Sequence, residues 1–102
     1  MQELPIEVPP SFVALFQEPG RLKPNRPWAE IAQRHELCED LAQMLTETAR
    51  TKRWELHATE ADVLARIGRG LHESSPLDLS PQEVQWVLRR LAELLGWAGQ
   101  VP

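Results

Sequence analysis

The chain has 102 residues, of which 42% are hydrophobic and 25% are charged. These values are typical of one globular domain and exclude a disordered chain or a membrane protein, because no apolar run approaches the roughly 20 residues that a spanning helix needs. The formal net charge is −4, which argues against a nucleic-acid-binding domain, since such domains usually carry a positive surplus that neutralises phosphates.

The first ten residues predict an extended arm. Leu4, Ile6 and Val8 alternate with glutamate and proline, and proline cannot donate a hydrogen bond to a strand ladder. An extended or polyproline-like segment is therefore expected over residues 1–10. We predict that its three apolar side chains dock on the parent domain or on a second copy of the chain, which makes them candidate interaction residues. A short helix is predicted next, over 11–18.

Residues 27–55 predict a long helix. Because no glycine or proline interrupts the chain until Gly68, the helix is unusually long, and residues 48–53 are the place where we expect it to fray or end. Trp28 and Trp54, near its two ends, are expected to be lids over the core. Its apolar side chains recur at steps of three and four residues, the period of a single helix face: Ile31, His35, Cys38, Leu41, Ala42, Leu45 and Ala49.

Two shorter helices are predicted over 60–73 and 81–95. Thr59 is placed to cap the first of them. The run Ser80–Glu83 is a stronger start signal, with serine as cap, proline at the first position and glutamate at the third. Gly96 is a typical stop for the second helix.

No segment has the alternation and hairpin turns of a sheet. The sequence therefore predicts an all-α fold in a single domain over 1–102. This fold is a small bundle of three main helices, preceded by a short N-terminal helix and the extended proline-rich arm.

His35 and Cys38 lie one helical turn apart, and two interpretations are open. They are either metal ligands or a thiolate with its base, or a buried thiol beside a histidine at the edge of the core, since both fall on the apolar stripe. Cys38 is the only cysteine, which excludes an intrachain disulfide. The only lysines, Lys23 and Lys52, are followed by proline and arginine, so there is no phosphate-binding loop. We predict no enzymatic activity, with no catalytic residue, no metal and no cofactor.

Trp86 is the residue that bears most on function. If Val84 marks the centre of the apolar face of the last helix, Trp86 lies on the far side with Arg89 and Arg90. Two interpretations are open: the arm or the short helix covers it, or it is a half-covered platform with an arginine over the indole. An exposed tryptophan beside arginines is typical of a binding hot spot. On the second interpretation, Trp86, Arg89 and Arg90 are candidate protein-interaction residues.

Several runs of the sequence match one group of proteins. They are Pro10-Ser11-Phe12, Phe16 with Pro19-Gly20, the run HELCED over 35–40 and the run RRLAELLGW over 89–97. In these runs the chain resembles small proteobacterial proteins labelled "ATPase with chaperone activity". The resemblance covers most of the chain and implies a place near chaperones or other protein machinery. The label also implies nucleotide hydrolysis, but the matching runs contain no active site to carry over.

From these observations we expect a small helical protein that works by binding another protein. A cytoplasmic location is expected because the N-terminus shows no charged-then-apolar leader. The partner is not identified by the sequence, and a homodimer is one option. The alternative is a nucleic-acid-associated regulator that uses a local basic patch of Arg50, Lys52, Arg53 and Arg66. The net negative charge makes nucleic acid the less favoured partner.

Overall fold

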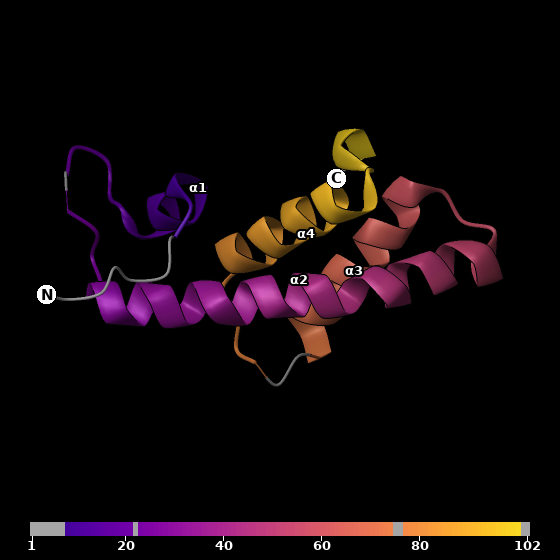
Figure 1. Cartoon of the computed structure of the whole chain (residues 1–102), viewed down its shortest axis with the longest axis horizontal. Coiled ribbons are helices and arrows are strands. Elements are labelled where there is room, and N and C mark those ends of the chain that lie inside the picture. Colours follow the sequence, from indigo (N-terminus) through magenta and orange to yellow (C-terminus); the bar gives the residue numbers. More distant parts are fainter. Residues whose placement is uncertain (1–7, 22, 75–76, 101–102) are drawn as a thin grey trace, which may run out of the picture.

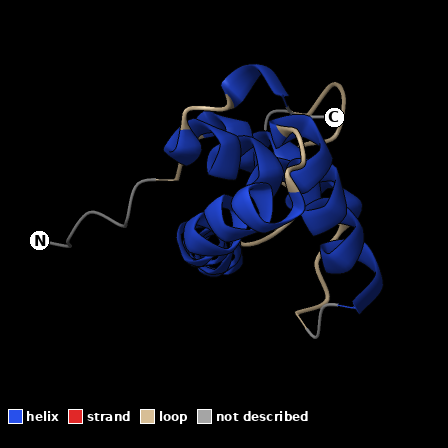
Figure 2. Ribbon diagram, turned by 90° about the vertical axis from the view of Figure 1, so that its right-hand side faces the viewer, coloured by secondary structure: helices blue, strands red, loops and turns tan. Residues whose placement is uncertain are grey.

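The computed structural model describes residues 8–21, 23–74 and 77–100. Over these ranges every regular element is a helix, and the predicted all-α fold is confirmed (Figures 1 and 2). Three main helices follow a short N-terminal one. In chain order the elements are α1 (Pro10–Val13), the 3-10 helix η1 (Ala14–Phe16), α2 (Trp28–Leu56), α3 (Glu60–Ser74), α4 (Pro81–Leu95) and the 3-10 helix η2 (Ala98–Gln100).

Helix α2 sets the length of the molecule. Its 29 residues span about 44 Å at 1.5 Å per residue, close to the longest dimension of 50 Å. Figure 1 shows it running along the long axis of the molecule, with α3 crossing it. The prediction that it frays or ends at 48–53 is wrong, because good helix formers such as Ala49 and Arg50 carry it on to Leu56. It ends where His57 adopts a left-handed conformation, with φ 51°. Glycine usually takes that position, so the sequence carried no stop signal there.

Both ends of α4 follow the sequence signals. The Ser80 hydroxyl accepts a hydrogen bond from the Glu83 N–H at 3.0 Å, and the Glu83 carboxylate accepts one from the Ser80 N–H at 2.9 Å. The predicted capping box is thus confirmed. At the other end Gly96 is left-handed, with φ 77°. The next N–H, that of Trp97, donates to the Ala92 carbonyl at 2.7 Å and closes the helix end.

Helix α3 is capped and closely packed. The Thr59 hydroxyl accepts a hydrogen bond from the Asp62 N–H at 3.1 Å, as the sequence predicted. Gly68 lies against α4, where an added Cβ would come within 2.9 Å of the Leu88 Cδ1 atom. Glycine at this position therefore allows α3 and α4 to approach each other.

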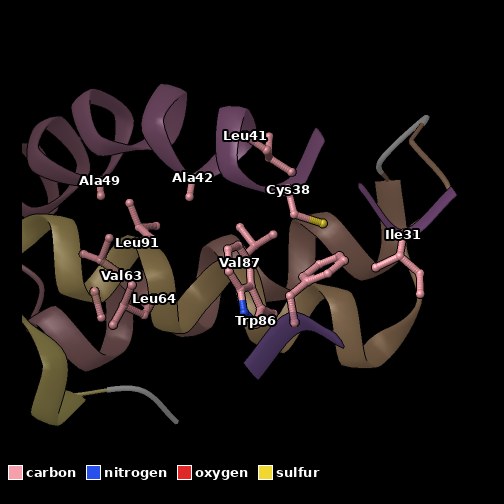
Figure 3. Packing of buried hydrophobic residues seen from close by; sticks show 12 residues of the cluster. Ile31, Cys38, Leu41, Ala42, Ala49, Val63, Leu64, Trp86, Val87 and Leu91 are labelled. Carbon is pink, nitrogen blue, oxygen red and sulfur yellow. The ribbon is translucent and has the colours of Figure 1, made fainter. Parts of the chain in front are cut away.

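The hydrophobic core lies where α2, α3 and α4 meet, with α1 packed against one end (Figure 3). Val8, at the end of the arm, is half-buried and packs against it. At Val8 the chain thus docks on itself. Leu4 and Ile6, the other two predicted arm contacts, lie outside the described residues. The buried residues of the core cluster are Phe12, Ile31, Cys38, Leu41, Ala42, Ala49, Val63, Leu64, Trp86, Val87, Leu91 and Ala92.

An ion pair fastens the start of α4 to α2. The Arg34 guanidinium donates to both carboxylate oxygens of Glu83, through Nε at 2.9 Å and Nη2 at 2.7 Å. The Glu83 side chain is only 5% exposed. Burial alone would raise the pKa of Glu83, but the hydrogen bonds from Arg34 and Ser80 hold that pKa below its ordinary value. One carboxylate therefore caps α4 and anchors it to its neighbour.

Candidate functional site

Trp86 is buried, with 8% of its surface exposed. The Phe12 ring meets it edge-on with the ring centroids 5.1 Å apart, and the His35 ring does so at 5.5 Å. The indole N–H donates a hydrogen bond to the Ser11 hydroxyl at 3.0 Å. Figure 3 shows Trp86 among the core side chains. The prediction of a half-covered platform is wrong, and the alternative, that the short helix covers Trp86, is correct.

The cover over Trp86 comes from a distant part of the chain. Ser11, in α1, precedes Trp86 by 75 residues, and Phe12 beside it is fully buried. The periodicity of α4 describes only how its own side chains are distributed around the helix. It does not show that a second layer packs on the flank that carries Trp86.

Arg89 and Arg90 do not share one role. Arg89 is exposed. Arg90 lies between α4 and α2, where its Nε and Nη2 atoms donate to the Glu39 carboxylate at 2.9 and 3.1 Å. A further bond of 3.1 Å joins Arg90 to Glu93. The hydrogen bonds to Glu39 raise the pKa of Arg90. The Arg90 guanidinium therefore pairs with carboxylates and does not make the predicted contact with the Trp86 indole.

The predicted site residues of α4 do meet, in a groove of about 930 Å³ between α1, α2 and α4. Trp86 forms part of its buried floor, and Arg90 is already ion-paired. Arg89 is left as the exposed cation of the groove. The lining residues are Pro9, Ser11, Leu15, His35, Glu39, Gln82, Gln85, Trp86, Arg89, Arg90 and Glu93.

His35 and Cys38 belong to the core. His35 is 8% exposed and Cys38 is fully buried. Burial raises the pKa of the Cys38 thiol to about 12, which is opposite to the lowered pKa of a nucleophilic cysteine. Within residues 8–21, 23–74 and 77–100, no three His, Cys, Asp or Glu side chains are grouped to hold a metal ion. The packing interpretation of this pair is the one that the geometry supports.

The pH dependence of stability reports on His35. Its Nδ1 atom is buried without a hydrogen-bond partner in the described part of the chain. Burial lowers its pKa below the ordinary 6.5, with Arg90 acting in the same direction and Glu39 and Glu36 opposing. Between the folded and unfolded pKa values the unfolded chain binds more protons, so the free energy of unfolding falls as the pH drops below 6.5, by at most about 1.4 kcal/mol per pH unit.

Urea unfolding at pH 7 and at pH 5 measures this dependence. We expect the His35→Gln variant to lose the part of the decline that lies between these two pH values. An unchanged decline in His35→Gln would contradict the assignment to His35.

A second candidate surface lies at the C-terminal end of α2. Trp54 is 80% exposed, and it borders a hollow of about 490 Å³. The other wall of this hollow is Trp97, which is half-buried and packs against the core. We call this surface the α2-end patch, and it consists of Arg50, Arg53, Trp54, His57 and Trp97.

The expectation that Trp28 and Trp54 are lids over the core is wrong. Trp28 is 44% exposed and Trp54 is 80% exposed. Ala49 is the last buried residue of α2, and Trp54 lies about 140° round the helix axis from it at 100° per residue. That angle is readable from the sequence, and it was the signal that Trp54 had left the apolar stripe.

The α2-end patch is positively charged. None of its five residues is acidic, although the chain as a whole has a net charge of −4. The Arg53 Nε atom lies 3.6 Å from the Glu60 carboxylate. Arg50 is exposed and forms no ion pair within the described ranges. The patch therefore combines an open indole with an uncompensated guanidinium.

The four residues of the predicted basic patch are divided between two hollows. Arg50 and Arg53 line the one beside Trp54. Lys52 and Arg66 line another, of about 260 Å³, between α2 and α3. Arg66 is also ion-paired with a neighbouring carboxylate of α3, at 3.0 Å. The structure thus does not gather the four cations into one surface.

Comparisons with known proteins add no relative. No protein-family model, no curated protein and no solved structure matches the chain. Among the described residues, none of the helices has the length and apolar character needed to cross a membrane.

Proposed function

We propose that this chain works by binding another protein through the α2-end patch. The open indole of Trp54 is the observation that carries the proposal. Tryptophan and arginine are the residue types most enriched at the energetic centres of protein interfaces, and here they lie together around a hollow. The proposal includes no catalytic step, and it keeps the cytoplasmic location expected from the sequence.

Folding does not account for Trp54. All residues from Arg50 to His57 are exposed, so about two turns of α2 extend past its last buried side chain, Ala49. An indole that is 80% exposed contributes little packing, and its truncation should change the free energy of unfolding by no more than about 0.5 kcal/mol. We therefore expect the Trp54 indole to act by contacting another molecule.

Charge favours a protein over a nucleic acid as the partner. Affinity for nucleic acid comes mainly from several cations that neutralise successive phosphates. Here the patch offers only Arg50 and Arg53, while Lys52 and Arg66 line a separate hollow. The net charge of −4 repels a polyanion such as nucleic acid more strongly than a peptide segment with a few carboxylates. The nucleic-acid alternative thus has less support.

The resemblance to proteins labelled "ATPase with chaperone activity" stays a prediction. It directs attention to chaperones and their clients as the first group in which to look for the partner. A second copy of the chain is another candidate partner. Size-exclusion chromatography of the purified protein shows whether the chain binds itself.

Affinity capture with two matched variants tests the proposal. The full chain, Trp54→Ala and Trp28→Ala are each used as bait in lysate, and retained proteins are quantified by mass spectrometry. Trp28 is the control because it is also an exposed tryptophan of α2, at the opposite end of the helix. We expect specific proteins to be retained by the wild type and by Trp28→Ala and to be depleted roughly 30-fold with Trp54→Ala, the loss typical of a hot spot.

The folded state of each bait is verified by circular dichroism before capture. If Trp54→Ala retains the same proteins as the wild type, the α2-end patch is not the binding surface.

A further inference from the structure

We infer that the α2-end patch takes an acidic peptide segment that carries one apolar side chain. The apolar side chain enters the hollow between Trp54 and Trp97, and the carboxylates of the segment lie at Arg50 and Arg53. This inference rests on the proposed function and names the chemistry of its partner.

The hollow is an open depression between two indoles. Its volume of about 490 Å³ leaves ample room for one apolar side chain of a partner. Its two indoles come from different elements, Trp54 from α2 and Trp97 from the segment after α4. The backbone N–H of Trp97 bonds to the Ala92 carbonyl, and its side chain packs against the core. One wall is therefore anchored to the core, and the other is an exposed ring that a partner can cover.

The charges around the hollow select an anionic partner. Arg50 and Arg53 lie on its rim, and no residue that lines it is acidic. The carbonyl groups at the end of α2 present a partial negative charge of about half an elementary charge, which two guanidinium groups outweigh. Lys52 lies on another face of α2, in a hollow that it shares with Glu47 and Glu55, and adds no net charge to this rim. Complementary charge steers and orients a partner at such a rim.

A contact to Arg53 requires exchange of an existing pair. Its distance of 3.6 Å to the Glu60 carboxylate, with side-chain exposures of 46% and 31%, is that of a weak, solvent-screened ion pair. A carboxylate of the partner replaces that of Glu60 without uncovering a buried charge. Arg50 needs no such exchange. We therefore expect Arg50→Glu to weaken binding of the segment more than Arg53→Glu does.

Peptide display tests the inference with defined probes. A library of random 12-residue peptides is selected on the full-length wild type and depleted on Trp54→Ala. Individual peptides are then measured by fluorescence anisotropy against the wild type, Arg50→Glu and Arg89→Glu. Arg89 is the control because it is exposed but lies on α4 in the other groove. The single-stranded oligonucleotide dodecathymidylate is measured in parallel.

We expect the selected peptides to be rich in aspartate and glutamate around one apolar residue. Their affinity should fall at least about tenfold with Arg50→Glu, remain unchanged with Arg89→Glu, and weaken as the salt concentration rises.

Peptides that depend on Trp54 but are neutral or basic would overturn the acidic partner and leave protein binding at this patch intact. If dodecathymidylate binds and loses affinity with Trp54→Ala while no peptide does, both the inference and the proposed function are overturned in favour of nucleic acid. If no peptide and no oligonucleotide binds in a Trp54-dependent manner while Trp54-dependent capture of proteins persists, the inference is overturned and the proposed function is kept; if the capture fails as well, both are overturned.

Discussion

Replacing Trp86 by alanine is expected to lower the free energy of unfolding by about 3–5 kcal/mol. The side chain is 8% exposed and packs edge-on against Phe12 and His35, so its removal leaves a cavity between α1, α2 and α4. It also removes the N–H that bonds the Ser11 hydroxyl. Urea denaturation followed by circular dichroism gives the value.

Two variants separate packing from hydrogen bonding at this position. Trp86→Phe keeps an aromatic ring and should cost less, about 1–2 kcal/mol, because Ser11 is exposed and can bond water in place of the indole. Trp54→Ala, on the exposed end of α2, should stay within about 0.5 kcal/mol of the wild type. A change of less than 1 kcal/mol in Trp86→Ala would contradict the buried position of this residue and restore it as a surface platform.

Glu83→Gln is expected to cost about 2–4 kcal/mol. The substitution keeps the shape of the side chain but removes the charge that Arg34 contacts at 2.7 and 2.9 Å. Breaking a fully buried pair costs about 3–5 kcal/mol, and the 28% exposure of the Arg34 side chain reduces that figure because water can solvate the remaining charge.

The same carboxylate gives stability a second pH dependence. The folded pKa of Glu83 lies below its ordinary value, so the unfolded chain binds more protons as the pH falls past that value. The contribution of Glu83 is present above the ordinary pKa of 4.5 and is lost as the pH falls through the folded pKa. This loss begins near pH 4.5, whereas the loss assigned to His35 begins near pH 6.5.

Glu93→Gln is the control for Glu83→Gln. Glu93 is also in α4 and ion-paired, with Arg90, but its side chain is 61% exposed, so the change should be small. Equal losses of stability in the two variants would show that burial does not distinguish the two pairs. Equilibrium unfolding in urea at pH 7 gives both values.

The helices were predictable because their signals are local. The capping box of Ser80 and Glu83 and the left-handed Gly96 are set by neighbouring residues, and short-range geometry of this kind depends little on the rest of the chain. The end of α2 was harder to predict, because His57 takes the left-handed conformation without being a glycine. The core face of α2 was also predictable from local sequence, because the helical period places its apolar residues between Ile31 and Ala49 on one side.

The two tryptophans that bear on function were placed wrongly for opposite reasons. Trp86 lies off the apolar stripe of α4 but is covered by α1, a tertiary contact that periodicity cannot contain. Trp54 was expected to cover the core, but α2 continues past its last buried residue and carries the indole into solvent. The candidate site was therefore missed even though its charged members, Arg50 and Arg53, were named as part of a basic patch.

Site-specific photo-crosslinking is the most direct test of the claim that a partner contacts the α2-end patch. A benzophenone-bearing phenylalanine analogue is placed at His57, an exposed residue of the patch, in one bait and at Trp28 in another, so that the Trp54 indole is kept in both. Each bait is the full chain and is irradiated in intact cells. We expect discrete crosslinked protein species from position 57 and not from position 28. Crosslinks from position 28 alone, or none from position 57, would contradict a partner at the α2-end patch.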